Sequence, residues 1–386
     1  MSAPLLMTSL QQTWQQLDRQ TTALNPMQLV QATKMAYPQF NQRGPQGQPM
    51  QQDAEEFYSN LMTTLATESR ELIQKGLPEV KSDELLGATN LIDALFGLRL
   101  EETLTCTEVD TEPTVTTTDM ARKLVCSIQG GSDSKSITNV SHVAEGIALS
   151  LEEGNIEKHS DVLGRNALWK RTQRISRLPQ ILVVQFGRFY WKATPDSQDH
   201  PNGVKCKVMK PVAFTTTLDV YEFCSGDIQK VLKKHRDAAI KAEEERLFAK
   251  SQAKKDDADG DTEMKTEESS DDPDLQAALA MSMQTDDAEP DKPVGPGLPA
   301  DFQGLYELFG VVTHKGRDAD GGHYMSWVRA PDSGKAEKIP DTDEFNDDWY
   351  VFDDDEVSPC KTEDVLKLKG GGDWHMSYLN FYRAKK

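Results

Sequence analysis

Cysteine is scarce in this sequence and shows neither a disulfide nor a metal-binding pattern. The five cysteines are odd in number and widely spaced, with no CxxC pair: Cys106, Cys126, Cys206, Cys224 and Cys360. A disulfide framework or a cysteine-rich zinc site needs matched pairs, so we expect neither. Isolated cysteines of this kind are typical of a reducing compartment.

Long apolar runs and an excess of basic residues are also missing. Because a membrane span needs about 18 consecutive apolar residues, we expect none. The first residues, MSAPLLMTSLQQTW, lack a basic start and a long apolar core, so we expect no signal peptide. The net charge of −20 and the pI near 4.8 argue against a nucleic-acid-binding protein, which needs a basic face. An acidic chain fits a partner with a basic surface or tail.

What the sequence does contain is enough apolar material for a sizeable core. Its 386 residues are 37% hydrophobic, with 13 Phe, 9 Tyr and 6 Trp. Residues 4–75 show the periodicity of amphipathic helices, and strand-like alternation begins near residue 90. Four more strands are predicted near the C-terminus, in YELFGVVTHKG, GGHYMSWVRA, DWYVFDDDEV and MSYLNFYRA. Helices followed by strands indicate an α+β fold.

Residues 226–300 differ from their surroundings in composition. A charged helix is predicted first, and residues 256–290 then carry 13 acidic residues, one lysine and no aromatic residue. Such a segment buries too little apolar surface to fold alone, so we expect it to be disordered. We interpret residues 226–300 as a charged, acidic insertion that interrupts a single domain.

A short amphipathic helix, residues 272–284, is predicted inside this insertion. Leu275, Ala278, Leu279 and Ser282 share one face, and the small alanine allows a partner to approach closely. The acidic run followed by Leu-x-x-Ala-Leu-x-x-Ser resembles a ubiquitin-interacting motif, which would make these four residues ubiquitin-binding. The alternative is a weakly helical linker, because an isolated helix of this length is marginal in water.

His323 and Asp353 form the main catalytic candidate in the sequence. His323 follows two glycines at the start of a predicted strand, and Asp353 ends another predicted strand thirty residues later. A carboxylate that binds one ring nitrogen fixes the tautomer, so that the other nitrogen can act as a base. The alternatives are an ordinary packing histidine and an acidic turn, which suits Asp355 best. A His–Asp pair also needs a nucleophile, and a cysteine would make it a thiol protease.

Four motifs together carry a family resemblance. QQDAEEF at 51–57, RISRLPQILVVQFGRF at 174–189, GGHYMSWVR at 321–329 and WYVFDDDEV at 349–357 resemble the ubiquitin-specific proteases, in the family's order and over nearly the whole chain. The resemblance implies a papain-like α+β fold with a helical thumb and a β-rich palm and fingers. It also implies a thiol-dependent deubiquitinase, without a cofactor, that hydrolyses the bond after the C-terminal glycine of ubiquitin.

The resemblance also implies a branch and its partners. Residues 91–108 and 370–382 are similar to the proteasome-associated branch, which implies ubiquitin, ubiquitinated proteins and the 26S proteasome as partners. It implies a cytoplasmic and nuclear location, and no binding to nucleic acid or membrane. Residues 1–386 would then be one catalytic domain that is incomplete at its N-terminus.

Individual residues acquire roles through the same resemblance. His323 corresponds to the catalytic histidine and Asp353 to the acid that orients it, while Gln52, Asp53 and Tyr324 correspond to ubiquitin-binding positions. Asp53 would contact the basic tail of ubiquitin, whose arginines suit a carboxylate. Loops near 190–207 and 315–322 match segments that cover the tail slot in the resting enzymes of this branch.

One part of the family pattern is missing. The family's nucleophile lies in an Asn-x-Cys-Tyr box, which this sequence does not contain, and the branch's N-terminal ubiquitin-like domain is absent too. None of the five cysteines lies at a helix start that would lower its pKa, so we expect no substitute. We expect a truncated form of an active hydrolase. A short isoform that binds ubiquitin without cleaving it, and a fragment that folds poorly, are the alternatives.

Overall fold

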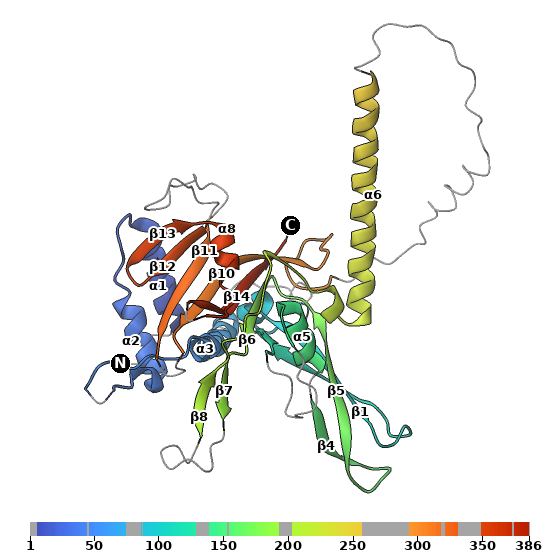
Figure 1. Ribbon diagram of the computed structural model, residues 1–386, viewed down its shortest axis with the longest axis horizontal. Helices are drawn as coiled ribbons and strands as arrows, with labels where there is room; N and C mark the ends of the chain where they lie inside the picture. The colour runs from blue at the N-terminus through green and yellow to red at the C-terminus, as the bar shows by residue number, and fades with distance from the viewer. Residues whose placement is uncertain are drawn as a thin grey trace, which may run out of the picture.

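The computed structural model describes residues 6–44, 46–74, 86, 88–128, 139–152, 154–192, 203–256, 293–317, 321–330, 349–372 and 374–385. Three helices near the N-terminus stand beside a large sheet, a second sheet extends from the opposite side, and one long helix projects outward (Figure 1). The described helices are α1 (Leu6–Arg19), α2 (Met27–Ala36), α3 (Ala54–Gln74), α4 (Leu91–Leu95), α5 (Val143–Glu152), α6 (Gly226–Asp256) and α8 (Thr362–Leu366), with 3-10 turns at Pro38–Asn41 and Tyr221–Phe223. None of the helices described is long and apolar enough to cross a membrane.

The strands fall into three sheets. The described strands are β1 (Leu98–Cys106), β2 (Val115–Ala121), β3 (Leu124–Cys126), β4 (Asn155–Ser160), β5 (Arg165–Arg177), β6 (Ile181–Phe186), β7 (Phe189–Lys192), β8 (Val204–Lys207), β9 (Thr217–Asp219), β10 (Leu305–Lys315), β11 (His323–Arg329), β12 (Trp349–Asp353), β13 (Glu356–Cys360) and β14 (Met376–Ala384). The large sheet has the order β13-β12-β11-β10-β14-β6-β3, with β9 beside β10. The four-stranded sheet runs β2-β1-β5-β4, and β7 pairs with β8 alone. The expected α+β class is confirmed.

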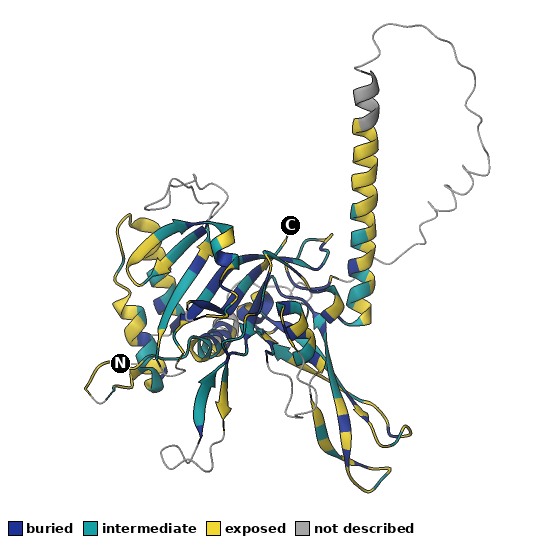
Figure 2. Ribbon diagram, in the orientation of Figure 1, coloured by how far each residue is buried: buried dark blue, intermediate teal, exposed yellow. Residues whose placement is uncertain are grey.

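Both faces of the large sheet are covered. On one face α3 places Tyr58, Met62 and Leu65 against Val183 of β6 and Leu379 of β14. The other face forms the main core, to which α5, α8 and the base of the four-stranded sheet contribute. Buried residues therefore concentrate in the sheet and the layers beside it, as Figure 2 shows. The period-2 alternation of β10 and β14 places their apolar side chains in these two cores.

The apolar run LPQILVVQFGRFYW contains two strands. Residues Ile181–Phe186 pair with β14 and β3, whereas Phe189–Lys192 pair with β8. The break falls at Gly187 and Arg188, where the backbone N–H of Arg188 donates to the carbonyl of Phe186. The cause is the Arg188 side chain, which is fully buried and needs backbone carbonyls around it.

The insertion is shorter than the sequence predicted. From Lys241 to Lys250 the side chains of α6 are exposed, and this part of the helix stands away from the domain (Figures 1 and 2). Leu232, however, is fully buried in the main core, and so is Val294, whose carbonyl accepts from the N–H of Leu178. Both ends of the predicted 226–300 insertion thus belong to the domain, because apolar side chains at each end complete its core.

Candidate active site

His323 lies where the sequence placed it, at the first residue of β11. The preceding Gly322 has a φ of +129°, and a Cβ there would collide with the carbonyl oxygen of Lys315 and the ring of His314. Only glycine tolerates both the left-handed backbone and this close approach. β11 can therefore begin directly against β10, where His323 pairs with Lys315.

Asp353 meets His323 through the register of two strands. β11 and β12 pair so that Ser326 faces Phe352, and one further step puts Asp353 opposite Met325. His323 and Met325 share a face, so Asp353 lies diagonally across from His323. The Asp353 Oδ1 is 2.5 Å from the Nε2 of His323. A two-residue turn begins just after it at Asp354, whose φ is +51°.

The direction of this contact fixes the possible chemistry. Because a carboxylate only accepts hydrogen bonds, the neutral ring carries its proton on Nε2 and leaves Nδ1 as the base. The side chains are partly open, with 39% of His323 and 45% of Asp353 exposed. A reacting group can therefore reach Nδ1 from solvent, and Asp353 would stabilise the imidazolium that forms.

The five cysteines differ in burial, and most are enclosed in the cores. Four of them are buried in the cores, and burial raises the pKa of Cys126 and Cys224 to about 12. Cys206 is partly exposed on β8, and its thiol donates to the carbonyl of Val204. His323 bonds to Asp353, whereas the thiols of Cys206 and Cys224 donate to the carbonyls of Val204 and Val220. The prediction that none of them substitutes is consistent with this placement.

Asp53 sits at the N-terminus of α3 with both carboxylate oxygens engaged. Its Oδ1 accepts from the backbone N–H of Glu55 at 2.9 Å and from the hydroxyl of Tyr378 at 2.7 Å. Its Oδ2 lies 3.6 Å from the ammonium of Lys205 on β8. Asp53 is thus a helix cap and a cation partner at once.

The two other predicted ubiquitin-binding positions flank Asp53. Gln52 precedes it, and its side-chain amide donates to the carbonyl of Met50 at 3.3 Å. The hydroxyl of Tyr324, the residue after His323, accepts from the N–H of Ala54 at 3.5 Å. The structure therefore brings 52–54 and the start of β11 together. Leu275, Ala278, Leu279 and Ser282 lie outside the described residues.

A cluster of aromatic and basic side chains beside Asp53 was not predicted. The ring of His314 lies 5.4 Å from that of Phe189 and 4.7 Å from that of Tyr324, and Phe189 is 5.1 Å from Tyr378. Lys207 reaches into the cluster, with its Nζ 2.6 Å from His314 Nδ1. The spacing of these residues in the sequence gives no signal, because five separate strands bring them together.

The cluster perturbs its titratable groups. Burial, helped by the charge of Arg188, lowers the pKa of Lys207 to about 8. Burial and the charge of Lys207 lower the pKa of His314 to about 4. The Lys207 ammonium also donates to the carbonyls of His314 and Gly316, which holds the β7–β8 hairpin against the end of β10. Of the two predicted covering loops, residues 190–192, 203–207, 315–317 and 321–322 are described, and the loops meet where Lys207 donates to Gly316.

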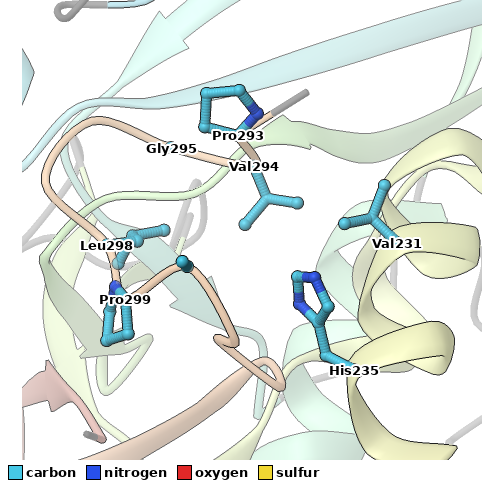
Figure 3. A pocket seen from close by; sticks show the side chains of 8 residues that line it. Val231, His235, Pro293, Val294, Gly295, Leu298 and Pro299 are labelled. Atoms are coloured by element: carbon cyan, nitrogen blue, oxygen red, sulfur yellow. The ribbon is translucent and has the colours of Figure 1, made fainter. Parts of the chain in front are cut away.

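Two further features could have been ligand sites. Within the described residues, His323, Asp353 and Asp354 are the group whose ligand atoms lie within 4.8 Å of one another. Two of the three are already paired, so the group needs no metal to explain it. A cavity of about 130 Å³ between α6 and residues 293–300 is lined by apolar side chains and by His235, as Figure 3 shows. Its lining shares no residue with the His323–Asp353 pair, and His235 Nδ1 lies 2.9 Å from the carbonyl oxygen of Phe302.

Acidification is expected to destabilise the fold through its buried histidines. The pKa of His314 and that of His375 both fall from 6.5 to about 4, mainly through burial. Between these values the unfolded chain binds protons that the folded chain does not, so the free energy of unfolding drops as the pH falls through this window. We expect a loss of about 4 kcal/mol between pH 7.5 and pH 5 in urea titrations, about 2 kcal/mol from each histidine.

The pH range of this loss separates the effect of the two buried histidines from the effect of the carboxylates. The pKa values of Glu108, Glu112, Glu145 and Glu307 lie below 4.5, so their contribution is lost only at lower pH. His159, an exposed histidine on β4, provides the matched control. His159→Asn should keep the full pH dependence, whereas a flat stability profile from pH 7.5 to 5 in the unaltered chain would contradict the prediction.

Comparison with known proteins shows that the chain is similar to members of one family. The model of the family described as ubiquitin carboxyl-terminal hydrolase matches residues 2–382. Ubiquitin carboxyl-terminal hydrolase 6 of Arabidopsis thaliana is 33% identical over 370 residues, which are 96% of this chain and 66% of that protein. Ubiquitin carboxyl-terminal hydrolase 6 of Schizosaccharomyces pombe is 31% identical, over 94% of this chain and 66% of that protein. The chain thus spans about two thirds of the length of these relatives.

A solved structure supports the fold. The SAGA Ubp8/Sgf11/Sus1/Sgf73 DUB module bound to ubiquitin aldehyde contains a chain with a TM-score of 0.55 and 18% identity, covering 100% of this chain and 60% of that one. The architecture described above is therefore that of the deubiquitinating proteases, as the four motifs predicted. The match over residues 2–382 and the two relatives lead to one conclusion: the chain belongs to the ubiquitin carboxyl-terminal hydrolase family.

Proposed function

We propose that this chain is the ubiquitin-binding and base-supplying part of a thiol-dependent deubiquitinase. The observation that carries the proposal is the hydrogen bond between His323 Nε2 and Asp353, which leaves His323 Nδ1 as a base. The next residue, Tyr324, accepts a hydrogen bond from the backbone N–H of Ala54, which follows Asp53. Asp53 offers a carboxylate to a cationic tail, and the space beside Gly321, where an added Cβ would meet no atom within 4 Å, is open to a chain that ends in Gly-Gly. The substrate class is ubiquitin linked through its C-terminal glycine.

In the proposed reaction His323 Nδ1 takes the proton of a cysteine thiol that lies outside these 386 residues. The thiolate attacks the carbonyl of the terminal glycine of ubiquitin, and the leaving amine takes the proton from His323. A thioester remains. Water then attacks the thioester with His323 again as base, which releases the ubiquitin carboxylate and restores the thiol. Asp353 holds the ring in place throughout both steps.

A second candidate function is a module that binds ubiquitin without cleaving it. The observation that favours it is the position of the five cysteines, four of them buried and none bonded to His323 among the described residues. In this case the surface around Asp53 and the helix 272–284 would act as a receptor for ubiquitin chains. The two candidates differ in one respect, which is whether a thiol attacks the terminal carbonyl.

A ubiquitin probe with an electrophile at its C-terminus separates the candidates. We expect this chain to bind ubiquitin reversibly and to form no covalent adduct. A longer protein that joins this chain to an Asn-x-Cys-Tyr segment should form the adduct, and His323→Asn should abolish it, while the matched change His159→Asn should not. Adduct formation by the 386-residue chain that is lost in His323→Asn would show that one of its own cysteines serves. Absence of any ubiquitin binding would overturn both candidates.

Three finer parts of the proposal rest on the sequence resemblance. We propose that the intact protein associates with the 26S proteasome in the cytoplasm and nucleus, and that residues 272–284 add a second ubiquitin contact. Co-sedimentation with purified proteasomes tests the association with the proteasome. Deletion of 270–287 tests the second ubiquitin contact, because it should weaken binding to ubiquitin chains more than binding to single ubiquitin. An unchanged affinity for chains would refute the motif.

A further inference from the structure

His375 is a buried histidine beside the proposed base. It lies directly before β14, only 3% of its surface is exposed, and its ring is 5.9 Å from the ring of His323 at an interplanar angle of 74°. Asp353 contacts an edge of the His323 ring at Nε2. His323 is therefore held between a carboxylate and a second imidazole, and only the first of these contacts was visible in the sequence.

A hydroxyl anchors the second imidazole. Thr313 on β10 is fully buried, and its Oγ1 lies 3.1 Å from His375 Nδ1. The same oxygen accepts from the indole N–H of Trp327 at 3.2 Å and can donate to the carbonyl of Met325 at 3.3 Å. A hydroxyl has one proton and two acceptor sites, so His375 donates through Nδ1–H if all three contacts are made. This arrangement leaves little freedom to the ring of His375.

We propose that His375 is a positioning residue that holds the His323 ring on Asp353. His323 is partly exposed, and a ring in that state changes rotamer readily unless its neighbours prevent it. The fixed ring of His375 blocks this movement on the inner side. This inference deepens the proposed function, and it rests on that function only for the role of His323 as base.

The environment of His375 also keeps it out of the proton transfer. Burial, the charge of His323 and the charge of Lys315 lower the pKa of His375 to about 4. The ring is therefore neutral when His323 carries a proton, so it adds no competing charge. The groups that face it are His323, Lys315, Asp353 and Lys207, together with the ring of Trp374 at 5.5 Å.

The test reads the tautomer of His323 directly and needs neither ubiquitin nor a thiol. In this chain labelled with ¹⁵N-histidine, at about pH 9, well above the ordinary imidazole pKa of about 6.5, His323 should show the Nε2–H form. His323→Asn identifies the signal. In His375→Ala the Nε2–H form should give way to a mixture of both tautomers. His375→Phe keeps a ring beside His323 but loses the hydrogen bond to Thr313, so its Nε2–H fraction should lie between those of the unaltered chain and His375→Ala.

The outcomes separate positioning from a merely structural role. A structural role would lower the stability in both variants and leave the tautomer unchanged, so a native His323 pattern in folded His375→Ala overturns the proposal. If His375→Ala does not fold, Thr313→Val serves instead, because it removes the anchoring hydroxyl and keeps the ring. It should reduce the Nε2–H fraction, and an unchanged fraction overturns the proposal equally. Loss of ubiquitin binding would contradict the proposed function and leave this result intact.

Discussion

Arg188→Met is expected to lower the free energy of unfolding by at least about 3 kcal/mol. Arg188 is fully buried, no carboxylate in the described part of the chain pairs with it, and its guanidinium donates to the carbonyls of four residues instead. These carbonyls belong to Ser377, Val208, Lys210 and Lys369, at 2.6 to 3.2 Å. Methionine fills much of the volume but removes every guanidinium donor, and although the Lys369 oxygen still accepts from the N–H of Val212, each buried oxygen left unsatisfied costs about 1–3 kcal/mol.

The measurement is urea unfolding at neutral pH, where Arg188 stays charged although burial lowers its pKa to about 10. Arg188→Lys should be almost as damaging, because one ammonium cannot span four carbonyls. Arg165→Met is the matched control, since 60% of the Arg165 side chain is exposed and its pair with Glu108 is at the surface. A loss below about 1 kcal/mol in Arg188→Met would show that water replaces the guanidinium.

Asp53→Asn is expected to weaken the binding of ubiquitin by roughly 10- to 100-fold, the range of a charge-assisted hydrogen bond. The amide oxygen of asparagine can still cap α3 and accept from Tyr378, so the fold should survive. What is lost is the negative charge that would hold a cationic tail. Calorimetric titration of this chain with ubiquitin measures the change, and an unaltered affinity would remove Asp53 from the site.

Lys205→Met should have the opposite effect on the same titration. The Lys205 ammonium lies 3.6 Å from Asp53 Oδ2, so an incoming cation must displace it. Lys192→Met is the matched control, because Lys192 lies on the same hairpin and its substitution removes the same charge. Tighter binding in Lys205→Met than in Lys192→Met supports the competition. Equal affinities would mean that Lys205 does not compete for Asp53.

The sequence predicted the parts of the site that depend on local pattern. The strands that carry His323 and Asp353 are short runs rich in aromatic and apolar residues, and the glycines before His323 and the acidic turn after Asp353 mark their ends. Once β11 and β12 pair in their observed register, the side chains of His323 and Asp353 lie close together. Where a contact follows from one hairpin or one strand pair, pattern reasoning is sufficient.

The contacts that the sequence did not reveal all join distant segments. His314, His375 and Lys207 look like ordinary polar residues of strands or strand ends, and only the packing of β8, β10 and β14 buries them. Arg188 sits in an apolar run that favours one long strand, and its buried guanidinium divides that run in two. Burial of a polar side chain depends on its tertiary partners, which spacing along one chain does not specify.

The two members of the catalytic pair differ in how firmly the sheet holds them. β11 is hydrogen-bonded on both sides, whereas β12 has only β13 beyond it, and β13 is the edge of the sheet. Edge hairpins open at a lower free energy than central strands. Opening of β12–β13 alone would separate Asp353 from His323 while β10 and β14 remain paired. We therefore expect the lifetime of the hydrogen bond between His323 and Asp353 to be set by local unfolding of this hairpin, and not by the stability of the whole domain.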